Sequence, residues 1–261
     1  MMFDRSIRIA TEKNGDDFSF LCIKDTLQDA DIVVANLEGP ITTHASMSVD
    51  SDVDSPENVT FTFPTSTASL LARHNIMVVN VGNNHIMNFG KEGLFQTRKW
   101  LTEAGITFFG DPETDNVAEL TIGGIRFSFV SWSDWTGRTK EKILTQVSSA
   151  ADEGRIVVIY AHWGEEYVEP SQRVRELARA FVDAGAEIVI GSHPHVILEN
   201  ELYSGKHIYY SLGNFVFDQY WNDEVRTGLL LKISFNEDGV ASLQEIKTRL
   251  ERDRRTCLKV S

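Results

Sequence analysis

Histidine, asparagine and glutamate side chains follow several apolar runs of this 261-residue sequence. The run EIVIGSHPHV contains His193 and His195, which flank Pro194. Proline fixes its own φ and pushes the residue before it toward extended backbone, so the two imidazoles are expected to point to one side. Paired imidazoles at that spacing are able to bind one cation or two adjacent cations. The pattern therefore predicts a metal site here.

Three other apolar runs end in residues of the same kind: Asn36 with Glu38, Asn84 with His85, and His162. An apolar β-branched run is typical of a strand that is buried on both faces. Sites in open α/β sheets gather at the carboxyl ends of the strands. We therefore expect these side chains to converge, although they are far apart in the sequence.

The chemistry of this set is that of a divalent metal centre. It offers one carboxylate, one amide oxygen and three imidazoles, a mixture that suits Mn, Fe, Zn or Ni. Two such ions clamp an anionic substrate and lower the pKa of a bridging water. The predicted ligands, for one or two ions, are Glu38, Asn84, His162, His193 and His195. His85 follows Asn84 directly and is better placed as a general acid or as a stabiliser of developing charge.

Each assignment has a structural alternative. Asn36 and Asn84 are also typical turn residues, because asparagine tolerates the left-handed region. His162 is alternatively a core histidine, and Glu38 a cap or loop charge. Trp132, Trp135 and Trp221 line a cleft or pack in the core or on the surface. The remaining candidates are interpreted as solvated or structural: Glu165, Glu166, Glu169, His44, His74 and His207.

The composition excludes several classes of partner. The net charge is −13, which disfavours nucleic acids and anionic membranes, since both are polyanions. An anionic substrate would need local cations, and bound metal ions would supply them. No run is long and apolar enough for a membrane span, and the first residues lack the apolar core of a signal peptide. Cys22 is interpreted as a core-packing residue rather than as half of a disulfide with Cys257, and the redox compartment stays open.

The expected elements alternate before a strand-rich end, which is typical of an α/β fold. Strands are expected at 32–35, 76–81, 106–109, 155–160 and 207–212, and at the start of the stretch 188–196. Helices are expected at 66–75, 91–104, 140–150 and 171–184, with a weak helical pattern at 17–30. Hairpins are expected about Gly123-Gly124 and Asp238-Gly239. Residues 41–64 are predicted to form a long surface loop, and residues 2–4 resemble the tail of a strand.

Five motifs in order give these residues a family context: NLEGP, NNHIMNFG, AHWGEEY, GSHPHV and YSLGNFVFD. Together they resemble the bacterial CapA family of capsule and poly-γ-glutamate biosynthesis proteins, which is related to calcineurin-like metallophosphoesterases. The resemblance extends from about residue 2 to about residue 235. It implies a single domain over residues 1–261 with a metallophosphatase-like four-layer sandwich, in which two mixed β-sheets are flanked by helices.

The resemblance also implies a role for each motif residue. Glu38 is similar to the bridging carboxylate, Asn84 to the amide ligand and His85 to the adjacent catalytic histidine. His162 and His193 would complete one metal site, and His195 would belong to the other. Arg5, Asn36 and Asn214 match recurring positions near the family's pocket, so they are candidates for substrate binding.

One departure concerns the start of the chain. The family usually opens with a strand that ends in Gly-Asp, followed by a short run to an arginine. Here Met1 to Arg5 resembles the rest of that run, the Gly-Asp is absent, and Asp4 is a poor substitute. We therefore expect that the first strand is truncated, and that the site containing His195 lacks its chief carboxylate, so the chain is predicted to hold one ion where a complete protein holds two.

Three functional hypotheses follow from this resemblance. The first is a metal-dependent hydrolase for capsule or poly-γ-glutamate synthesis or export, in which activated water attacks a phosphoester or an acyl or amide centre. The second is a non-catalytic accessory protein that binds the polymer or a membrane synthase. The third is a transferase or amide hydrolase that acts on γ-glutamyl bonds. Relatives typically act outside the cytoplasmic membrane, often through an N-terminal anchor, and an upstream segment would supply one here.

Overall fold

Helices separate β1 from β2, β2 from β3, β5 from β6 and β6 from β7, and a strand-rich region ends the chain, as the sequence predicts. The computed structural model describes residues 1–259. Its helices are α1 (Arg5–Asn14), η1 (Asp16–Phe20), α2 (Lys24–Gln28), η2 (Pro56–Val59), α3 (Ser66–Arg73), α4 (Gly90–Glu103), α5 (Lys140–Asp152) and α6 (Gln172–Asp183). Its strands are β1 (Val33–Asn36), β2 (Ile76–Asn80), β3 (Thr107–Phe109), β4 (Ala118–Ile122), β5 (Ile125–Ser133), β6 (Ile156–His162), β7 (Ile188–Ser192), β8 (Asn200–Tyr203), β9 (Lys206–Tyr209), β10 (Thr227–Asn236), β11 (Gly239–Leu250) and β12 (Thr256–Leu258).

The strands form three sheets in the described part of the chain. One is a parallel sheet in the order β1-β2-β3, and one is an antiparallel sheet in the order β10-β11-β12. The third is a mixed sheet in the order β4-β5-β6-β7-β9-β8, with parallel strands at its centre. The expected α/β architecture of sheets flanked by helices is confirmed, although three sheets stand where two were predicted.

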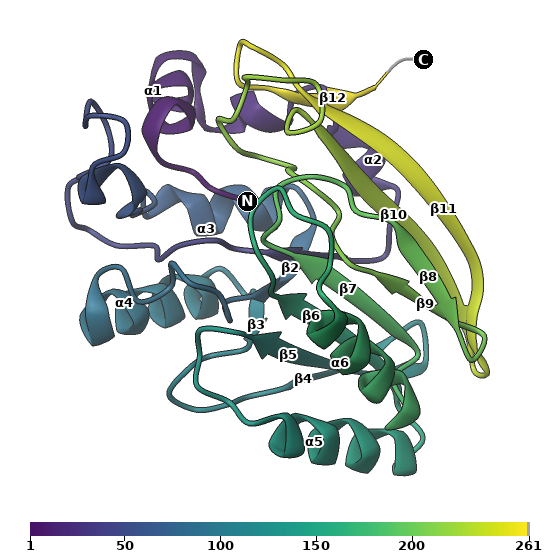
Figure 1. Ribbon diagram of the computed structural model, residues 1–261. Helices are drawn as coiled ribbons and strands as arrows, with labels where there is room; N and C mark the ends of the chain where they lie inside the picture. The colour runs from purple at the N-terminus through teal and green to yellow at the C-terminus, as the bar shows by residue number, and fades with distance from the viewer. Residues whose placement is uncertain (260–261) are drawn as a thin grey trace.

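Three apolar clusters hold the layers together. The first packs α1, α3 and α4 onto one face of β1 and β2, and the second packs α5 and α6 onto the outer face of the mixed sheet. The third lies between the sheets and includes Val78, Phe129, Ile190 and Leu229. Figure 1 shows α5 and α6 beside β5 and β6, with α4 on the side of β3. The order of layers is therefore helix, sheet, sheet, helix.

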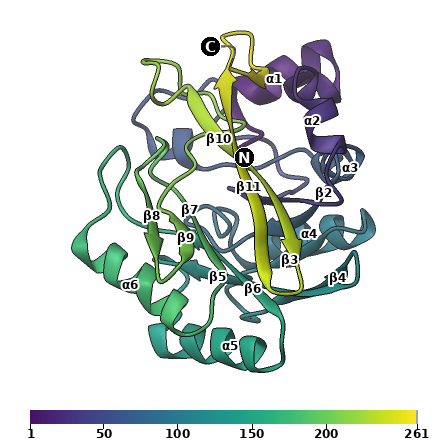
Figure 2. The same ribbon diagram turned by 90° about the vertical axis from the view of Figure 1, so that its right-hand side faces the viewer.

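The long ribbon of β10 and β11 lies on the right of Figure 1 and faces the viewer in Figure 2. Its two strands turn at Asp238-Gly239, as predicted, and β4 and β5 turn at Gly123-Gly124. Glycine at positive φ suits these tight turns, and Gly123, Gly124 and Gly239 all have positive φ. The sequence patterns thus identify both hairpins correctly.

Several local expectations are wrong. Residues 2–4 belong to no assigned strand, and the helix α1 and the short strand β8 were not predicted. The stretch 17–30 divides into η1 and α2 instead of one helix, and Cys22 is exposed in the turn between them. Cys22 is therefore not a core residue, and it does form a disulfide with Cys257, with a Cα–Cα distance of 4.7 Å.

Between Ile41 and Pro64 the structure assigns one regular element, η2. Near the two ends of this segment, Ile41 and Phe63 are buried and form an isolated bridge with each other. None of the described helices has the length and apolar character that crossing a membrane requires.

Candidate metal centre

The carboxyl ends of four strands meet at one rim of the layered sheets. β1 ends at Asn36, two residues before Glu38, and β2 ends four residues before Asn84. In the mixed sheet, β6 ends at His162 and β7 ends one residue before His193. Parallel strands that run in the same direction bring these ends together. Each predicted ligand therefore lies at the end of a strand or a few residues after it, and the apolar residues of these strands pack between the layers.

Glu38, His193 and His195 form the tightest cluster. Their ligand atoms all lie within 4.8 Å of one another, and all three residues are buried. Glu38 Oε1 is 3.9 Å from His195 Nε2 and 3.9 Å from His162 Nε2. These separations are too long for hydrogen bonds. Two metal–ligand bonds of about 2.1 Å each would span such a gap.

Two atoms of this cluster lack a protein partner among the described residues. Glu38 Oε1 and His193 Nδ1 are buried and accept or donate no hydrogen bond. Leaving a buried polar atom unpaired costs about 1–3 kcal/mol, so such atoms are uncommon in folded proteins. A divalent ion fits these residues, because a carboxylate and imidazoles are its usual ligands and their free atoms converge. The cluster can therefore hold a metal ion.

Hydrogen bonds orient His195 for such a role. The amide nitrogen of Asn214 donates to the Val225 carbonyl at 3.0 Å and to Gln219 Oε1 at 2.9 Å. Its oxygen must therefore face His195 Nδ1, which lies 2.9 Å away and donates to it. The proton of His195 is thus on Nδ1, and the lone pair on Nε2 points toward Glu38.

A second chain of hydrogen bonds orients Asn84. It starts at the Val59 carbonyl, which accepts from the Asn88 amide at 3.1 Å, so the Asn88 oxygen accepts from His85 Nδ1 at 3.1 Å. His85 Nε2 then accepts from the Asn84 amide nitrogen, also at 3.1 Å. The Asn84 oxygen is left facing His162 Nε2 at 2.9 Å. Asn84 therefore offers an oxygen ligand beside the imidazole of His162.

The segment His193-Pro194-His195, the HPH segment, has an unexpected backbone conformation. His193 has a φ of 100° and His195 a φ of 62°, so neither residue is extended as predicted. Non-glycine residues in this region cost about 1–3 kcal/mol each, and they persist where the surrounding structure holds them. Gly191 just before them admits no side chain, since a Cβ would lie 2.1 Å from the Tyr210 carbonyl oxygen. The imidazoles converge through this bend rather than through strand alternation.

Burial and charge set the protonation states. Burial alone would raise the pKa of Glu38, but attraction between its carboxylate and the protonated forms of His162, His195, the N-terminus and His85 outweighs burial and lowers the pKa to about 2. Burial lowers the pKa of His85 and of His193, and lowers that of His162 well below its ordinary value. An ionised carboxylate and neutral imidazoles are the forms that bind metals.

The three predicted substrate-binding residues make their polar contacts inside the protein. Asn36 donates to Glu38 Oε2 at 3.2 Å, and its oxygen accepts from Asn80 and Asn83. Asn214 holds His195, as described above. The Arg5 guanidinium bonds to Asp218 and to Asn58.

Arg5 also connects to the histidines through aromatic rings. Its guanidinium lies 5.1 Å from the ring centre of Phe61 and 5.5 Å from that of Phe217. Phe61 packs on His85 at 4.4 Å between ring centres, and Phe217 packs on His195 at 4.7 Å. Asp4 is separate from this arrangement, because its carboxylate accepts from Arg8 Nε and from the Thr62 amide.

Sequence reasoning missed several contributors. Ser192 contacts His162 Nδ1 at 3.1 Å, Asn88 orients His85, and Glu166 Oε1 lies 3.9 Å from His195 Nε2 although half of its side chain is exposed. Asn88 lies within the NNHIMNFG motif, so the motif itself contained that signal. Ser192 immediately precedes His193, but a serine beside a histidine is too common in sequences to indicate a contact between them.

Aromatic residues surround the cluster. Trp135 packs against His193 with 4.4 Å between ring centres, and Tyr167 packs against Trp221 at 5.6 Å and His195 at 6.0 Å. Trp135, Tyr167 and Trp221 are all partly exposed. Two of the three tryptophans suggested by the sequence therefore lie in this rim, whereas Trp132 is buried against Phe181.

The chain is similar in sequence to known capsule synthesis proteins. The family model described as "Bacterial capsule synthesis protein PGA_cap" matches residues 1–219. The chain is 29% identical to the "Capsule biosynthesis protein CapA" of Bacillus anthracis over 96% of its own length and 66% of that protein. It is also 29% identical to the "PGA biosynthesis protein CapA" of Bacillus subtilis (strain 168), over 94% and 68% of the two chains.

A more distant relative is the "Probable polyglutamine synthesis accessory protein Rv0574c" of Mycobacterium tuberculosis, which is 28% identical over 86% of this chain and 67% of that protein. The chain thus spans about two thirds of the length of these relatives. Because the family model covers most of the sequence and includes Glu38, Asn84, His162, His193 and His195, the chain belongs to the bacterial capsule synthesis protein family PGA_cap.

Proposed function

We propose that this chain is a metal-dependent hydrolase of the CapA type, which acts in the synthesis or export of a capsule polymer such as poly-γ-glutamate. The observation that supports this best is the convergence of Glu38, His193 and His195, two of which have unpaired buried atoms. A divalent ion bound there would supply Lewis-acid polarisation of the substrate and activation of water. The ion would be Mn, Fe, Zn or a similar metal.

The residues around the ion have distinct roles in this proposal. Glu38, His193 and His195 hold it, and Asn84 with His162 offers further ligand atoms next to Glu38. His85 is the candidate catalytic residue, because its neutral imidazole has Nε2 as an acceptor that is held by Asn84. Arg5, Asn36 and Asn214 are positioning residues, because their polar atoms bond within the protein.

The substrate is proposed to be anionic, either a phosphoester or a γ-glutamyl polymer. The chain has a net charge of −13, so an anion would depend on the ion for attraction. The rim of Trp135, Tyr167 and Trp221 would contact the less polar part of such a polymer. The bond that is cleaved follows from neither the fold nor the family.

The test compares metal content and turnover in three proteins. The three proteins are the chain itself, a His193→Ala/His195→Ala variant and a His85→Ala variant. Each is purified without chelator, and its metal content is quantified by elemental analysis. Each is then assayed with an aryl phosphodiester and with γ-glutamyl oligomers. We expect about one to two equivalents of a transition metal, lost only in the double variant, and turnover lost in both variants.

Absence of metal from the wild-type chain, even after reconstitution with Mn, Zn and Fe, would rule out a metalloenzyme. Turnover that survives in the His85→Ala variant would remove the catalytic role of His85. Which substrate class is hydrolysed decides between a phosphoesterase and an enzyme that cleaves or transfers γ-glutamyl groups.

A second candidate is a non-catalytic accessory protein that binds the polymer or a membrane synthase. It is favoured by the name of the mycobacterial relative and by Asp4, whose carboxylate is taken up by Arg8 and Thr62 instead of facing the cluster. In that case the chain would bind γ-glutamyl polymer without turning it over, and His85→Ala would leave the binding affinity unchanged.

A further inference from the structure

One carboxylate beside the candidate metal centre has no role in the proposed function. Glu166 Oε1 lies 3.9 Å from His195 Nε2, and Glu38 Oε1 lies at the same distance from that nitrogen. Both gaps are too long for a hydrogen bond, and two metal–ligand bonds of about 2.1 Å each would span either of them. His195 is also the one ion-pairing partner of Glu166 in the described part of the chain.

The tight cluster by itself leaves an ion short of protein ligands. Glu38, His193 and His195 offer one ligand atom each. Zinc sites are tetrahedral and manganese sites are commonly octahedral, so both take more ligands than this. His162 approaches from the side of Glu38 Oε1, which lies 3.9 Å from its Nε2. Near His195, the carboxylates that approach among the described residues are those of Glu38 and Glu166.

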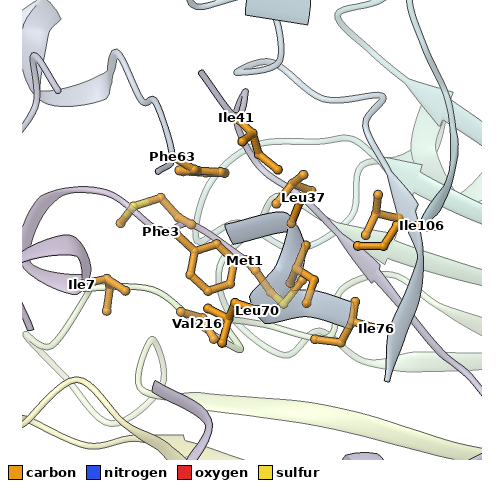
Figure 3. Packing of buried hydrophobic residues seen from close by; sticks show 14 of the residues in the cluster. Met1, Phe3, Ile7, Leu37, Ile41, Phe63, Leu70, Ile76, Ile106 and Val216 are labelled. Atoms are coloured by element: carbon orange, nitrogen blue, oxygen red, sulfur yellow. The ribbon is translucent and has the colours of Figure 1, made fainter. Parts of the chain in front are cut away.

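The two carboxylates differ in how tightly they are held. Glu38 is buried, and its neighbours Leu37 and Ile41 pack in the apolar cluster that Figure 3 shows. Its Oε2 accepts from the Asn36 amide at 3.2 Å, which leaves Oε1 for an ion. Glu166 lies outside the tight cluster, and 47% of its side chain is exposed. It is therefore able to turn toward an ion without disturbing the packing around it.

The backbone next to Glu166 is held against the HPH segment. The Tyr167 backbone N–H donates to the Pro194 carbonyl at 2.8 Å, between the two histidines. Tyr167 has a φ of 62°, and a bulky residue in this region persists only where the surrounding structure holds it. Strained backbone of this kind clusters at functional sites. The bend at Tyr167 keeps Glu166 beside His195.

Side-chain hydrogen bonds fix the same bend. The Tyr167 hydroxyl accepts from Gln219 Nε2 at 2.8 Å. Gln219 Oε1 in turn accepts from the Asn214 amide at 2.9 Å, and both of these residues are buried. Asn214 is the residue that orients His195. One network of hydrogen bonds therefore fixes the free nitrogen of His195 and the loop that carries Glu166.

We propose that Glu166 is a further ligand of the ion held by Glu38, His193 and His195, and that its carboxylate completes the coordination on the side of His195. This role rests on the metal centre of the proposed function. It gives that centre one carboxylate that is buried and fixed and a second that is exposed and able to turn.

The test compares metal affinity in four proteins: the wild-type chain and the variants Glu166→Gln, Glu165→Gln and Glu169→Gln. Each protein is stripped of metal, and its affinities for Zn²⁺ and Co²⁺ are measured in competition with a chromogenic chelator. Glu165 and Glu169 are matched controls, because they are exposed residues of the same loop and their variants remove the same charge. The melting temperatures of the stripped proteins check that all four are folded.

We expect Glu166→Gln to weaken metal binding by at least about tenfold, since losing a residue that only orients a ligand already weakens binding by about 10- to 100-fold. The control variants should stay within about twofold of the wild-type affinity, because salt screens an exposed charge that does not contact the ion. An unchanged affinity in Glu166→Gln would overturn the proposal. An equal loss in all three variants would also overturn it, because the effect would then be one of net charge.

The visible absorption spectrum of the Co²⁺-loaded proteins separates a ligand from a residue that acts through its charge alone. These bands depend on the number and type of ligands around the ion. At saturating Co²⁺, the spectrum of Glu166→Gln should differ from that of the wild-type chain, and the spectrum of Glu165→Gln should not. A Glu166→Gln spectrum identical to that of the wild-type chain would contradict direct ligation.

These outcomes distinguish the role of Glu166 from the proposed function. A wild-type chain that binds neither Zn²⁺ nor Co²⁺ would overturn both. Tight metal binding that is insensitive to Glu166→Gln would overturn the role of Glu166 alone and leave the proposed function standing. Because no turnover is measured, a chain without hydrolase activity would still support the role of Glu166 if its metal affinity falls in this variant only.

Discussion

At the scale of single residues, the site depends on hydrogen bonds that fix imidazole tautomers. Asn214 is the clearest example, because its amide nitrogen has only acceptors around it and its oxygen must face His195. Asn88 orients His85 in the same way, because its amide nitrogen donates to the Val59 carbonyl and its oxygen therefore faces His85 Nδ1. These asparagines determine which nitrogen of each histidine is free, so they control ligand geometry without being ligands.

We predict that Asn214→Ala weakens metal binding by about 10- to 100-fold, because His195 loses the acceptor that holds its proton on Nδ1. The measurement is a metal titration in competition with a chromogenic chelator. Asn14→Ala is a matched control, since Asn14 is exposed and bonds only to the Ala10 carbonyl within its own helix. An unchanged affinity in the Asn214 variant would show that the orientation of His195 does not depend on this bond.

At the scale of elements, buried ion pairs fix helices to strand ends. Arg98 on α4 makes a two-point contact with Asp111, which follows β3, and Asp111 is almost fully buried. Burial opposes ionisation of this carboxyl group, but the hydrogen bonds from Arg98 outweigh it and hold the pKa of Asp111 below its ordinary value. The pair therefore connects α4 to the parallel sheet whose strands β1 and β2 lead to Asn36 and Asn84.

Replacing Arg98 with methionine should lower the free energy of unfolding at pH 7 by about 2 kcal/mol, because a buried carboxylate loses charged hydrogen bonds. The pKa of Asp111 is depressed in the folded state, so the contribution is present above its unfolded value of about 3.9 and is lost as the pH falls through the folded value. Urea denaturation from pH 7 to pH 2.5 measures the difference. Lys99→Met is the control, since Lys99 is exposed and lies 3.9 Å from Glu103.

At the scale of the whole molecule, one covalent bond joins distant parts of the chain. The disulfide links Cys22, in the turn after η1, to Cys257 on β12, across 235 residues of sequence. Cross-links that close long loops restrict the unfolded chain most in the entropic model of their effect. This bond thus ties the helices near the N-terminus to the antiparallel sheet.

We predict that Cys22→Ser lowers the free energy of unfolding by about 2–5 kcal/mol, since the unfolded chain gains the freedom that the cross-link removes. Guanidinium denaturation with and without dithiothreitol tests this. The wild-type chain should lose stability in the reductant and reach the level of Cys22→Ser, whereas the variant should not respond to it. A wild-type chain that is equally stable in both conditions would contradict the prediction.

Much of the fold follows from local sequence patterns. Apolar β-branched runs identify β1, β2 and β6 to within two residues at each end and also the start of β7, and the Gly-Gly and Asp-Gly pairs identify the hairpins. These signals are strong because a strand buried on both faces tolerates few polar residues. The helix α1 lacked such a signal, since it contains the polar sequence RSIRIATEKN and buries only Ile7. The exposed Cys22 was misjudged because its partner is 235 residues away.

The sequence by itself determined which residues stand at the ends of buried strands, and hence that Glu38, Asn84, His162, His193 and His195 face a common rim. The reason is that parallel strands present their carboxyl ends together, which is a property of chain direction and local pattern. Only the tertiary structure decided that His193 and His195 converge through positive φ, and that Asn214 orients His195. It also decided that residues of β1 and β10 line a common cavity, because distances between elements depend on the packing of all three apolar clusters at once.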